Sequence, residues 1–280
     1  MTKTVHAGAI PFGGNHPLVL IAGPCVIESE KLVLQTAESI KTICDRLDMP
    51  FVFKSSYLKD NRSSEGSYQG PGLKEGLRIL KKVKEEVGVP VLSDIHDQHD
   101  AEAVSEVLDI IQIPAYLSMQ TSLTLAVAGT GRVVNVKKGQ FLDPGDVRNI
   151  VGKIENQGNE KILLTERGSC FGYHNLVVDM RSFQIMRETG YPVIFDPTHA
   201  IRVYGISSAD PRGGTPQFVP ALSRAAAAAG IDGIFIETHP KCDEAKCDAA
   251  SMWPLPLLEK LLVQVKAVDD LVRSGEELRL

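Results

Sequence analysis

The sequence lacks any apolar run long enough to cross a membrane. A transmembrane helix needs about eighteen consecutive apolar residues, and no segment of the 280 residues approaches that length. Residues 1–14 also lack a basic stretch followed by an apolar one, so we expect no secretory signal and a cytoplasmic location. The formal net charge is −5, so neither nucleic acid nor an anionic membrane is an expected partner.

Cysteine is scarce and irregularly spaced. The five cysteines are an odd number, and no two of them have Cys-x-x-Cys spacing. This argues against a disulfide framework and predicts reduced thiols. A Gly-x-Gly-x-x-Gly turn is also missing after the first apolar run. Its absence argues against a doubly wound open sheet, which is the main alternative fold.

What the sequence does contain is a regular alternation of short β-rich runs with longer helical patterns. The runs are nearly continuous in Val, Ile, Leu and Phe, as expected of strands covered on both faces. Eight strand–helix units predict an α/β protein with one (β/α)8 TIM-barrel domain over residues 1–280. We predict its strands at Leu18–Ile27, Phe51–Tyr57, Val89–His96, Asp109–Tyr116, Arg132–Lys138, Lys161–Gly168, Pro192–His199 and Gly233–Pro240.

Helical periodicity fills the segments between those strands. The clearest helices are predicted at Glu30–Leu47, Leu73–Val87, Gln98–Leu108, Gln217–Ala229 and Pro256–Val272. Residues 1–17 form an N-terminal extension ahead of the barrel. Within it, Val5–Pro11 followed by Gly13 and Gly14 predicts a hairpin that covers the bottom of the barrel.

Each predicted strand ends in, or carries, polar or reactive side chains. In a TIM barrel the C-terminal ends of the strands meet at one mouth, where the active site lies. One such ending is consistent with an ion pair in the core, but eight in succession favour a functional site. In strand order, the residues are Cys25; Lys54, followed by Lys59, Asn61 and Arg62; Asp94 and His96; Gln112; Lys137 and Lys138; Glu166 and Arg167; Asp196 and His199; Glu237 and His239.

A subset of five cations from this group lies in an acidic protein, which indicates a site for a polyanion. Arg binds carboxylate or phosphate through two parallel hydrogen bonds, and Lys supplies a point charge. Five cations suit two phosphorylated small molecules better than one, although any one of them could instead belong to a structural ion pair. The set is Lys54, Lys59, Arg62, Lys137 and Arg167.

A second set indicates a metal. Cys25, His199 and Glu237 end strands one, seven and eight, which become neighbours when the barrel closes, and Asp248 in the following loop can reach the same point. Thiolate, imidazole and carboxylates together suit a borderline divalent ion such as Zn, Fe(II), Mn or Co. Alone, Cys25 would be read as a small buried hydrophobe. A rival site would combine the side chains of Cys242, Cys247 and His239, whose spacing is not a standard zinc pattern.

The residues lie in segments that resemble the ordered motifs of the 3-deoxy-D-manno-octulosonate 8-phosphate synthases. The resemblance extends from about Leu18 to Trp253. It implies a homotetrameric barrel that joins phosphoenolpyruvate to arabinose 5-phosphate, releases phosphate and makes the sugar acid of lipopolysaccharide. The segments are LIAGPCVIES, FVFKSSY, KDNRSS, LSDIH, IIQIPAYL, VVNVKKGQF, LLTERG, FGYHNLVVDMRS, VIFDPTH, GIFIETHP and AKCDAAS.

The resemblance also implies individual roles. Members with Cys after Gly-Pro on strand one depend on a metal and members with Asn do not, so Cys25 implies the metal-dependent group. The implied metal ligands are Cys25, His199, Glu237 and Asp248. The implied phosphoenolpyruvate site comprises Lys54, Lys59, Lys137, Arg167 and the Ala115 backbone. The implied aldose phosphate site comprises Asn61, Arg62 and Ser63, with Asp94 and Gln112 completing the pocket. The expected catalytic residues are Lys54, Lys59, Asp94, Lys137 and His199.

Four positions depart from the family pattern and bear on the identity of the aldose. Asp60 stands where Ala is usual, Gln69 and Met119 where Arg is usual, and Ser122 where Asp is usual.

Two alternative functions remain open. The first is a 3-deoxy-D-arabino-heptulosonate 7-phosphate synthase, which uses erythrose 4-phosphate. That family has Pro-Arg-Thr where this chain has Asn61-Arg62-Ser63, which argues against it. The second is a catalytically silent barrel. The presence of Cys25 and His199, together with the cations Lys137 and Arg167, argues against that.

Overall fold

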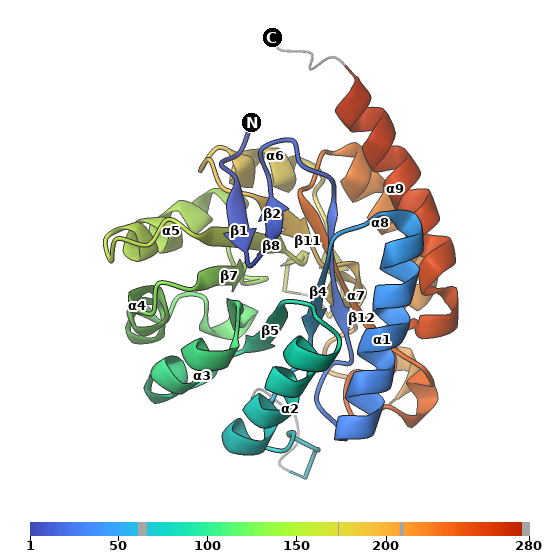
Figure 1. Ribbon diagram of the computed structural model, residues 1–280. Helices are drawn as coiled ribbons and strands as arrows, with labels where there is room; N and C mark the ends of the chain where they lie inside the picture. The colour runs from blue at the N-terminus through green and yellow to red at the C-terminus, as the bar shows by residue number, and fades with distance from the viewer. Residues whose placement is uncertain (61–65, 173, 208–209, 276–280) are drawn as a thin grey trace.

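A ring of strands surrounded by helices dominates the computed structural model, which describes residues 1–60, 66–172, 174–207 and 210–275 (Figure 1). Neighbouring strands of the ring are parallel, and β12 pairs with both β11 and β3, so the sheet closes on itself. The predicted TIM barrel is therefore confirmed. The strands, in order around the ring, are β3 (Val19–Gly23), β4 (Phe51–Lys54), β5 (Val91–Asp94), β6 (Ile110–Ile113), β7 (Val133–Lys137), β8 (Ile162–Glu166), β11 (Val193–Phe195) and β12 (Gly233–His239).

The barrel strands are buried along their whole length, which explains their nearly continuous apolar sequences. Their side chains alternate between the barrel interior and the surrounding helices. One large apolar cluster contains side chains from all eight strands and from the helices around them. Polar side chains enter the strands mainly near their C-terminal ends, as at Lys54, Asp94 and Glu166.

Helices connect successive strands and cover the outside of the ring (Figure 1). The first helix begins after Ser29, whose hydroxyl accepts a hydrogen bond from the Leu32 N–H, and ends at Asp48 in a left-handed conformation. Its buried residues recur at helical spacing, so the predicted bounds Glu30–Leu47 are confirmed. The main helices are α1 (Glu30–Leu47), α2 (Leu73–Glu86), α3 (Ala101–Val107), α4 (Thr121–Gly129), α5 (Val147–Glu155), α6 (Arg181–Arg187), α8 (Val219–Ala228) and α9 (Leu258–Ser274).

The predicted hairpin is present at the N-terminus. Strands β1 (Val5–Ala7) and β2 (Ile10–Phe12) pair antiparallel. The buried Phe12 ring lies beside Gly233, the first residue of β12, so the hairpin lies at the N-terminal end of the barrel. The hairpin therefore does not cover the opposite end, where the polar strand ends lie.

The loops also contain short strands and 3-10 turns. Strands β9 (Ser169–Cys170) and β10 (Leu176–Val177) form a second short hairpin, and β13 (Trp253–Pro254) pairs with the end of β12. Short 3-10 turns occur at Gln98–Asp100, Ala115–Leu117, Pro144–Asp146, Pro211–Gly213, Pro216–Phe218, Cys242–Glu244 and Leu255–Leu257. None of the helices in the described part of the chain has both the length and the apolar character needed to span a membrane.

The seventh strand is shorter than predicted. Strand β11 ends at Phe195, so the prediction of Pro192–His199 is wrong beyond that residue. Residues Pro197–Ala200 instead form the short helix α7. Asp196 caps this helix by accepting a hydrogen bond from the His199 N–H, and proline at the first helical position favours the turn. His199 is thus presented on a helical turn above the strand. Cys25 likewise lies two residues beyond the end of β3.

Candidate active site

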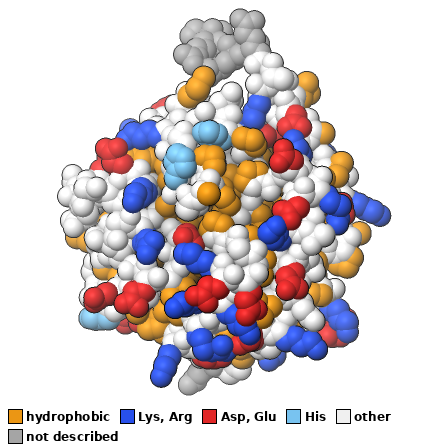
Figure 2. Space-filling model, viewed as in Figure 1, with side chains coloured by type: hydrophobic (Ala, Val, Ile, Leu, Met, Phe, Trp, Pro, Cys, Tyr) orange, Lys and Arg blue, Asp and Glu red, His pale blue; other side chains and the backbone are white. Residues whose placement is uncertain are grey.

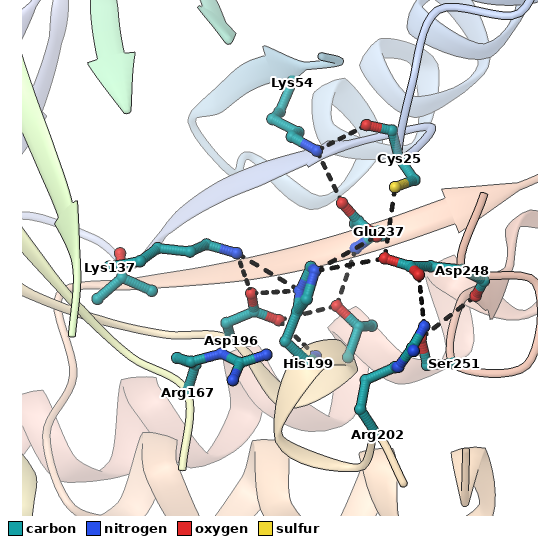
Figure 3. Close-up of polar contacts among 12 residues, drawn as sticks. Cys25, Lys54, Lys137, Arg167, Asp196, His199, Arg202, Glu237, Asp248 and Ser251 are labelled. Carbon is teal, nitrogen blue, oxygen red and sulfur yellow. Dashed lines mark hydrogen bonds and ion pairs between the residues drawn. The ribbon is translucent and has the colours of Figure 1, made fainter. Parts of the chain in front are cut away.

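A cavity of about 240 Å³ opens at the C-terminal ends of the barrel strands. It combines cations that follow several strands with two members of the expected metal set, His199 and Asp248, whereas Cys25 and Glu237 are not among its lining residues (Figure 3). Its lining residues are Lys59, Asp94, Gln112, Pro114, Ala115, Tyr116, Lys137, Arg167, His199, Arg202, Tyr204, Gly205, Ile206 and Asp248.

Asp94, at the end of β5, anchors one wall of the cavity. Its carboxylate accepts a hydrogen bond from Lys59 Nζ at 2.7 Å and another from the Gln112 side-chain amide at 2.5 Å. Burial alone would raise the pKa of Asp94, but the ammonium groups of Lys59 and Lys54 hold that pKa well below its usual value. The group is therefore an anion, and it fixes the Lys59 ammonium at the cavity wall.

Asp196, at the end of β11, holds two groups on the opposite wall. Its carboxylate accepts a hydrogen bond from Lys137 Nζ and lies 2.7 Å from His199 Nδ1. Burial lowers the pKa of His199 despite the neighbouring carboxylate, so the imidazole is neutral near pH 7. Since Nδ1 faces Asp196, the tautomer with the proton on Nδ1 leaves the lone pair of Nε2 directed away from Asp196.

His199 Nε2 points toward two carboxylates. It lies 3.8 Å from Glu237 Oε2 and 3.7 Å from Asp248 Oδ2. The Cys25 sulfur lies 3.5 Å from the same Asp248 oxygen (Figure 3). Asp248 therefore joins the four predicted ligands into one cluster, in which His199, Glu237 and Asp248 offer ligand atoms within 4.8 Å of one another.

The hydrogen bonding of Glu237 indicates that a cation fits this cluster. Its Oε1 accepts a hydrogen bond from Lys54 Nζ at 2.7 Å, but its buried Oε2 has no hydrogen-bond partner among the described residues. Burial would raise the pKa of Glu237, and the neighbouring Lys54 ammonium lowers it, so the carboxylate is charged. A buried anionic oxygen without a partner is costly. A divalent cation among the nitrogen, sulfur and oxygen donors would satisfy it.

Arg167 differs from the other cations of the cavity. Its guanidinium is buried, donates from Nη1 to the Gln140 side chain at 3.3 Å, and lies 5.7 Å from the Tyr204 ring. Its Nε has no hydrogen-bond partner, and the guanidinium forms no ion pair with a carboxylate within residues 1–60, 66–172, 174–207 and 210–275. The neighbouring Glu166 carboxylate instead accepts the backbone N–H groups of Arg167 and Gly168. Arg167 is thus poised for an anionic ligand.

Several predicted residues lie elsewhere. Lys54 does not line the cavity, because its ammonium is directed to Glu237 and to the Cys25 carbonyl. Asn61, Arg62 and Ser63 fall outside the described residues. Ala115 lies at the cavity wall. Of the departures from the family pattern, none is among the lining residues; the positions are Asp60, Gln69, Met119 and Ser122.

The rival cysteine and histidine site does not assemble within the described residues. The Cys242 sulfur faces the backbone carbonyls of His239 and Met252 at 3.8 and 3.7 Å. Cys247 instead faces Cys25, with the two sulfur atoms 2.6 Å apart.

Sequence reasoning missed three contributors to the site. The sequence identifies Asp196 as a strand end but does not show that it is the partner that orients His199. Arg202 and Tyr204 lie in the polar loop after α7, and the Arg202 guanidinium donates a hydrogen bond to Asp248 Oδ1. Asp196, in the Asp-Pro-Thr-His segment, could have been found as a helix cap three residues before a histidine. The other two carry no comparable local signal.

Comparison with known proteins gives concordant results. Residues 2–274 match the DAHP synthetase I family. Three relatives named 2-dehydro-3-deoxyphosphooctonate aldolase come from Trichlorobacter lovleyi, Geotalea daltonii and Geobacter metallireducens. They are 56%, 55% and 54% identical to this chain over 273 residues, which is 98% of this chain and the full length of each relative.

Proposed function

The chain belongs to the DAHP synthetase I family and, within it, to the 2-dehydro-3-deoxyphosphooctonate aldolases, and we propose that it condenses phosphoenolpyruvate with arabinose 5-phosphate. Water is consumed, and the products are 3-deoxy-D-manno-octulosonate 8-phosphate and phosphate. The observation that carries the proposal is the cavity itself, in which Arg167, Lys59 and Lys137 face the space beside the cluster around Asp248.

Phosphoenolpyruvate is assigned to the side of the cavity that holds Arg167 and Lys137. The Arg167 fork matches a carboxylate or phosphate, and the Lys137 ammonium adds a point charge close by. Lys59 and the backbone of Ala115 complete this half of the site. Lys54 does not line the cavity and would instead contribute by holding the carboxylate of Glu237 in place through a hydrogen bond.

The aldose phosphate is assigned to Asn61, Arg62 and Ser63, on the evidence of the sequence motif alone. Asp94 and Gln112 line the adjoining wall, where their mutual hydrogen bond leaves them oriented toward the cavity. Because the two substrates are both anionic, the cations also offset the repulsion between them in the attack geometry.

A divalent ion would be held by Cys25, His199, Glu237 and Asp248, with Zn, Fe(II), Mn and Co as candidates. When bound, such an ion supplies Lewis acidity that polarises the aldehyde or lowers the pKa of a water.

In the reaction, the enol carbon of phosphoenolpyruvate attacks the aldehyde carbon of the second substrate. Positive character develops at the second carbon of phosphoenolpyruvate, water adds there, and the hemiketal phosphate formed then loses phosphate. The protein's part is to hold both phosphorylated molecules in place. Lys137 and Arg167 can stabilise the phosphate as it leaves, because both are fixed and largely shielded from water.

The finer biological setting is also part of the proposal. By the family resemblance, the product serves lipopolysaccharide synthesis, the enzyme works in the cytoplasm, and four copies of the chain form a homotetramer.

A phosphate-release assay tests the function. Phosphoenolpyruvate would be offered with arabinose, ribose or erythrose phosphates, and arabinose 5-phosphate should give the highest kcat/KM. Preference for erythrose 4-phosphate would instead support the heptulosonate synthase alternative. Absence of phosphate release with every aldose, in metal-supplemented protein, would support a silent barrel.

A further inference from the structure

The Cys25 and Cys247 sulfur atoms lie 2.6 Å apart, about half an ångström longer than a disulfide bond. Both side chains are buried, in a small apolar cluster with Val26 and Met252. We propose that Cys25 and Cys247 are a site of reversible oxidation, forming a disulfide when the ligand cluster holds no metal and a peroxide is present. The effect on activity rests on the proposed function, in which Cys25 is a metal ligand; the disulfide itself does not.

The fold holds the two sulfur atoms together. Cys25 follows β3, and Cys247 lies in the loop after the neighbouring strand β12. That loop is fastened to the Cys25 segment, since the Lys246 N–H donates to Glu28 Oε1 at 3.0 Å. The Lys246 ammonium lies 4.6 Å from the Tyr68 ring centroid, and the Tyr68 hydroxyl donates to the backbone of the same segment. Thiol pairing therefore needs little movement, which raises the effective concentration of each thiol toward the other.

A small oxidant can approach from the cavity. Asp248 lines the cavity, and its Oδ2 lies 3.5 Å from the Cys25 sulfur. One thiolate attacks a peroxide oxygen and cleaves the O–O bond, giving a sulfenic acid and hydroxide. The second thiolate attacks that sulfur and displaces hydroxide. The two thiols together lose two electrons and two protons, and one hydrogen peroxide is reduced to two molecules of water.

The consequence follows from the position of Cys25. A disulfide would withdraw its sulfur from the cluster with His199, Glu237 and Asp248, so a divalent ion would lose one of its expected ligands. A metal already bound to the Cys25 thiolate would in turn protect that thiolate from the peroxide. Loss of metal and oxidation would then reinforce each other, and a thiol reductant would restore the site.

Tryptic mapping can identify the bond without ambiguity, because each of the five cysteines falls in a separate peptide. Cys25 lies in residues 4–31, and Cys247 begins residues 247–260. Chelated, reduced protein would be treated with hydrogen peroxide, alkylated and digested without reductant. We expect residues 4–31 linked to residues 247–260, and two fewer titratable thiols. Added Mn²⁺ should restore activity only after dithiothreitol, and protein loaded with Mn²⁺ before the peroxide should keep its thiols.

Two variants sharpen the test. Cys247→Ser should form no linked peptide, and its peroxide inactivation should resist dithiothreitol because Cys25 proceeds to the sulfinic acid. Cys242→Ser is the matched control, since its sulfur lies in the same loop but faces backbone carbonyls, and it should behave as the wild type. Each oxidised sample is compared with its own reduced sample, so differences in starting activity cancel.

The proposal is wrong if metal-free wild-type protein keeps all its thiols, or if Cys247→Ser recovers with dithiothreitol as well as the wild type does. It is also wrong if the thiols persist and Cys247→Ser mainly weakens Mn²⁺ binding, which would make the sulfur pair a two-thiolate ligand set. If chelation leaves activity unchanged, the proposed metal requirement fails, whereas the linked peptide still decides whether the disulfide forms.

Discussion

Replacing Arg167 with alanine should weaken the binding of phosphoenolpyruvate more than that of the aldose phosphate. The guanidinium is buried, contacts the Gln140 amide and the Tyr204 ring, and has no carboxylate partner within the described residues. A substrate anion would therefore gain its hydrogen bonds without displacing an internal ion pair. One charge-assisted hydrogen bond contributes about 1.5–3 kcal/mol, which corresponds to roughly a 10- to 150-fold change in affinity.

The assay is steady-state phosphate release, with each substrate varied at saturating concentrations of the other. Arg167→Ala should raise the KM for phosphoenolpyruvate by about 10-fold or more, with a smaller effect on the KM for the aldose. Arg167→Lys keeps the charge but loses the fork, so it should give an intermediate value. Arg181→Ala is a matched control, because that side chain is exposed and pairs with Asp179.

A thermal shift separates lost binding from lost folding. Because a buried cation without a carboxylate partner is costly, its removal should not lower the melting temperature of the unliganded protein. Phosphoenolpyruvate should raise the melting temperature of the wild type and of Arg181→Ala, but not of Arg167→Ala. If Arg167→Ala raised the KM for the aldose more than that for phosphoenolpyruvate, the two halves of the cavity would be assigned in reverse.

Three further outcomes are expected. Exhaustive chelation should abolish turnover, and Mn, Co, Zn or Fe(II) should restore it to different extents; full activity in protein shown by elemental analysis to be metal-free would contradict the ligand cluster. Asp196→Asn should weaken metal binding by about 10- to 100-fold in a chelator competition assay, because Asp196 orients His199; unchanged affinity would show that the imidazole needs no such partner. Asp94→Asn should lower the free energy of unfolding by about 3–5 kcal/mol at pH 7. Because the folded-state pKa of Asp94 is depressed, the contribution of its carboxylate to the free energy of unfolding is complete above about pH 4 and declines as the pH falls below that value. Denaturant titrations in which wild type and Asp94→Asn differ by the same free energy of unfolding from pH 7 to pH 3.5 would contradict the buried anion.

The sequence predicted the barrel well because its strands are buried on both faces and its helices have clear periodicity. The ends of elements were harder. Pro197 and Asp196 carry a local helix-start signal that competes with the apolar run before them, so the sequence predicts a strand at His199, which in fact belongs to α7. Strand adjacency sufficed to bring the Cys25, Glu237 and Asp248 positions together, since β3 and β12 are the pair that closes the barrel.

The partners of the charged residues could not be predicted, because they depend on contacts across the barrel. Lys54 is the clearest case. A cation at a strand end predicts a substrate contact. The Lys54 ammonium instead donates a hydrogen bond to Glu237, which lies on β12, the strand that pairs with β3 to close the barrel. Arg202 was overlooked for the converse reason, since a cation in a polar loop has no preferred direction until the loop after β12 brings Asp248 beside it.

These pairings explain how an apolar barrel tolerates so many cations at its mouth. A buried ion without a partner costs several kcal/mol, and most of the cations are matched one to one by carboxylates that end other strands or lie in neighbouring loops. The pairs are Lys54 with Glu237, Lys59 with Asp94, Lys137 with Asp196, and Arg202 with Asp248. Arg167 stands outside this scheme among the residues described. The paired lysines are thus held in place before any substrate arrives, and the anion that enters first gains most by meeting Arg167, whose charge no carboxylate of the described chain has yet neutralised.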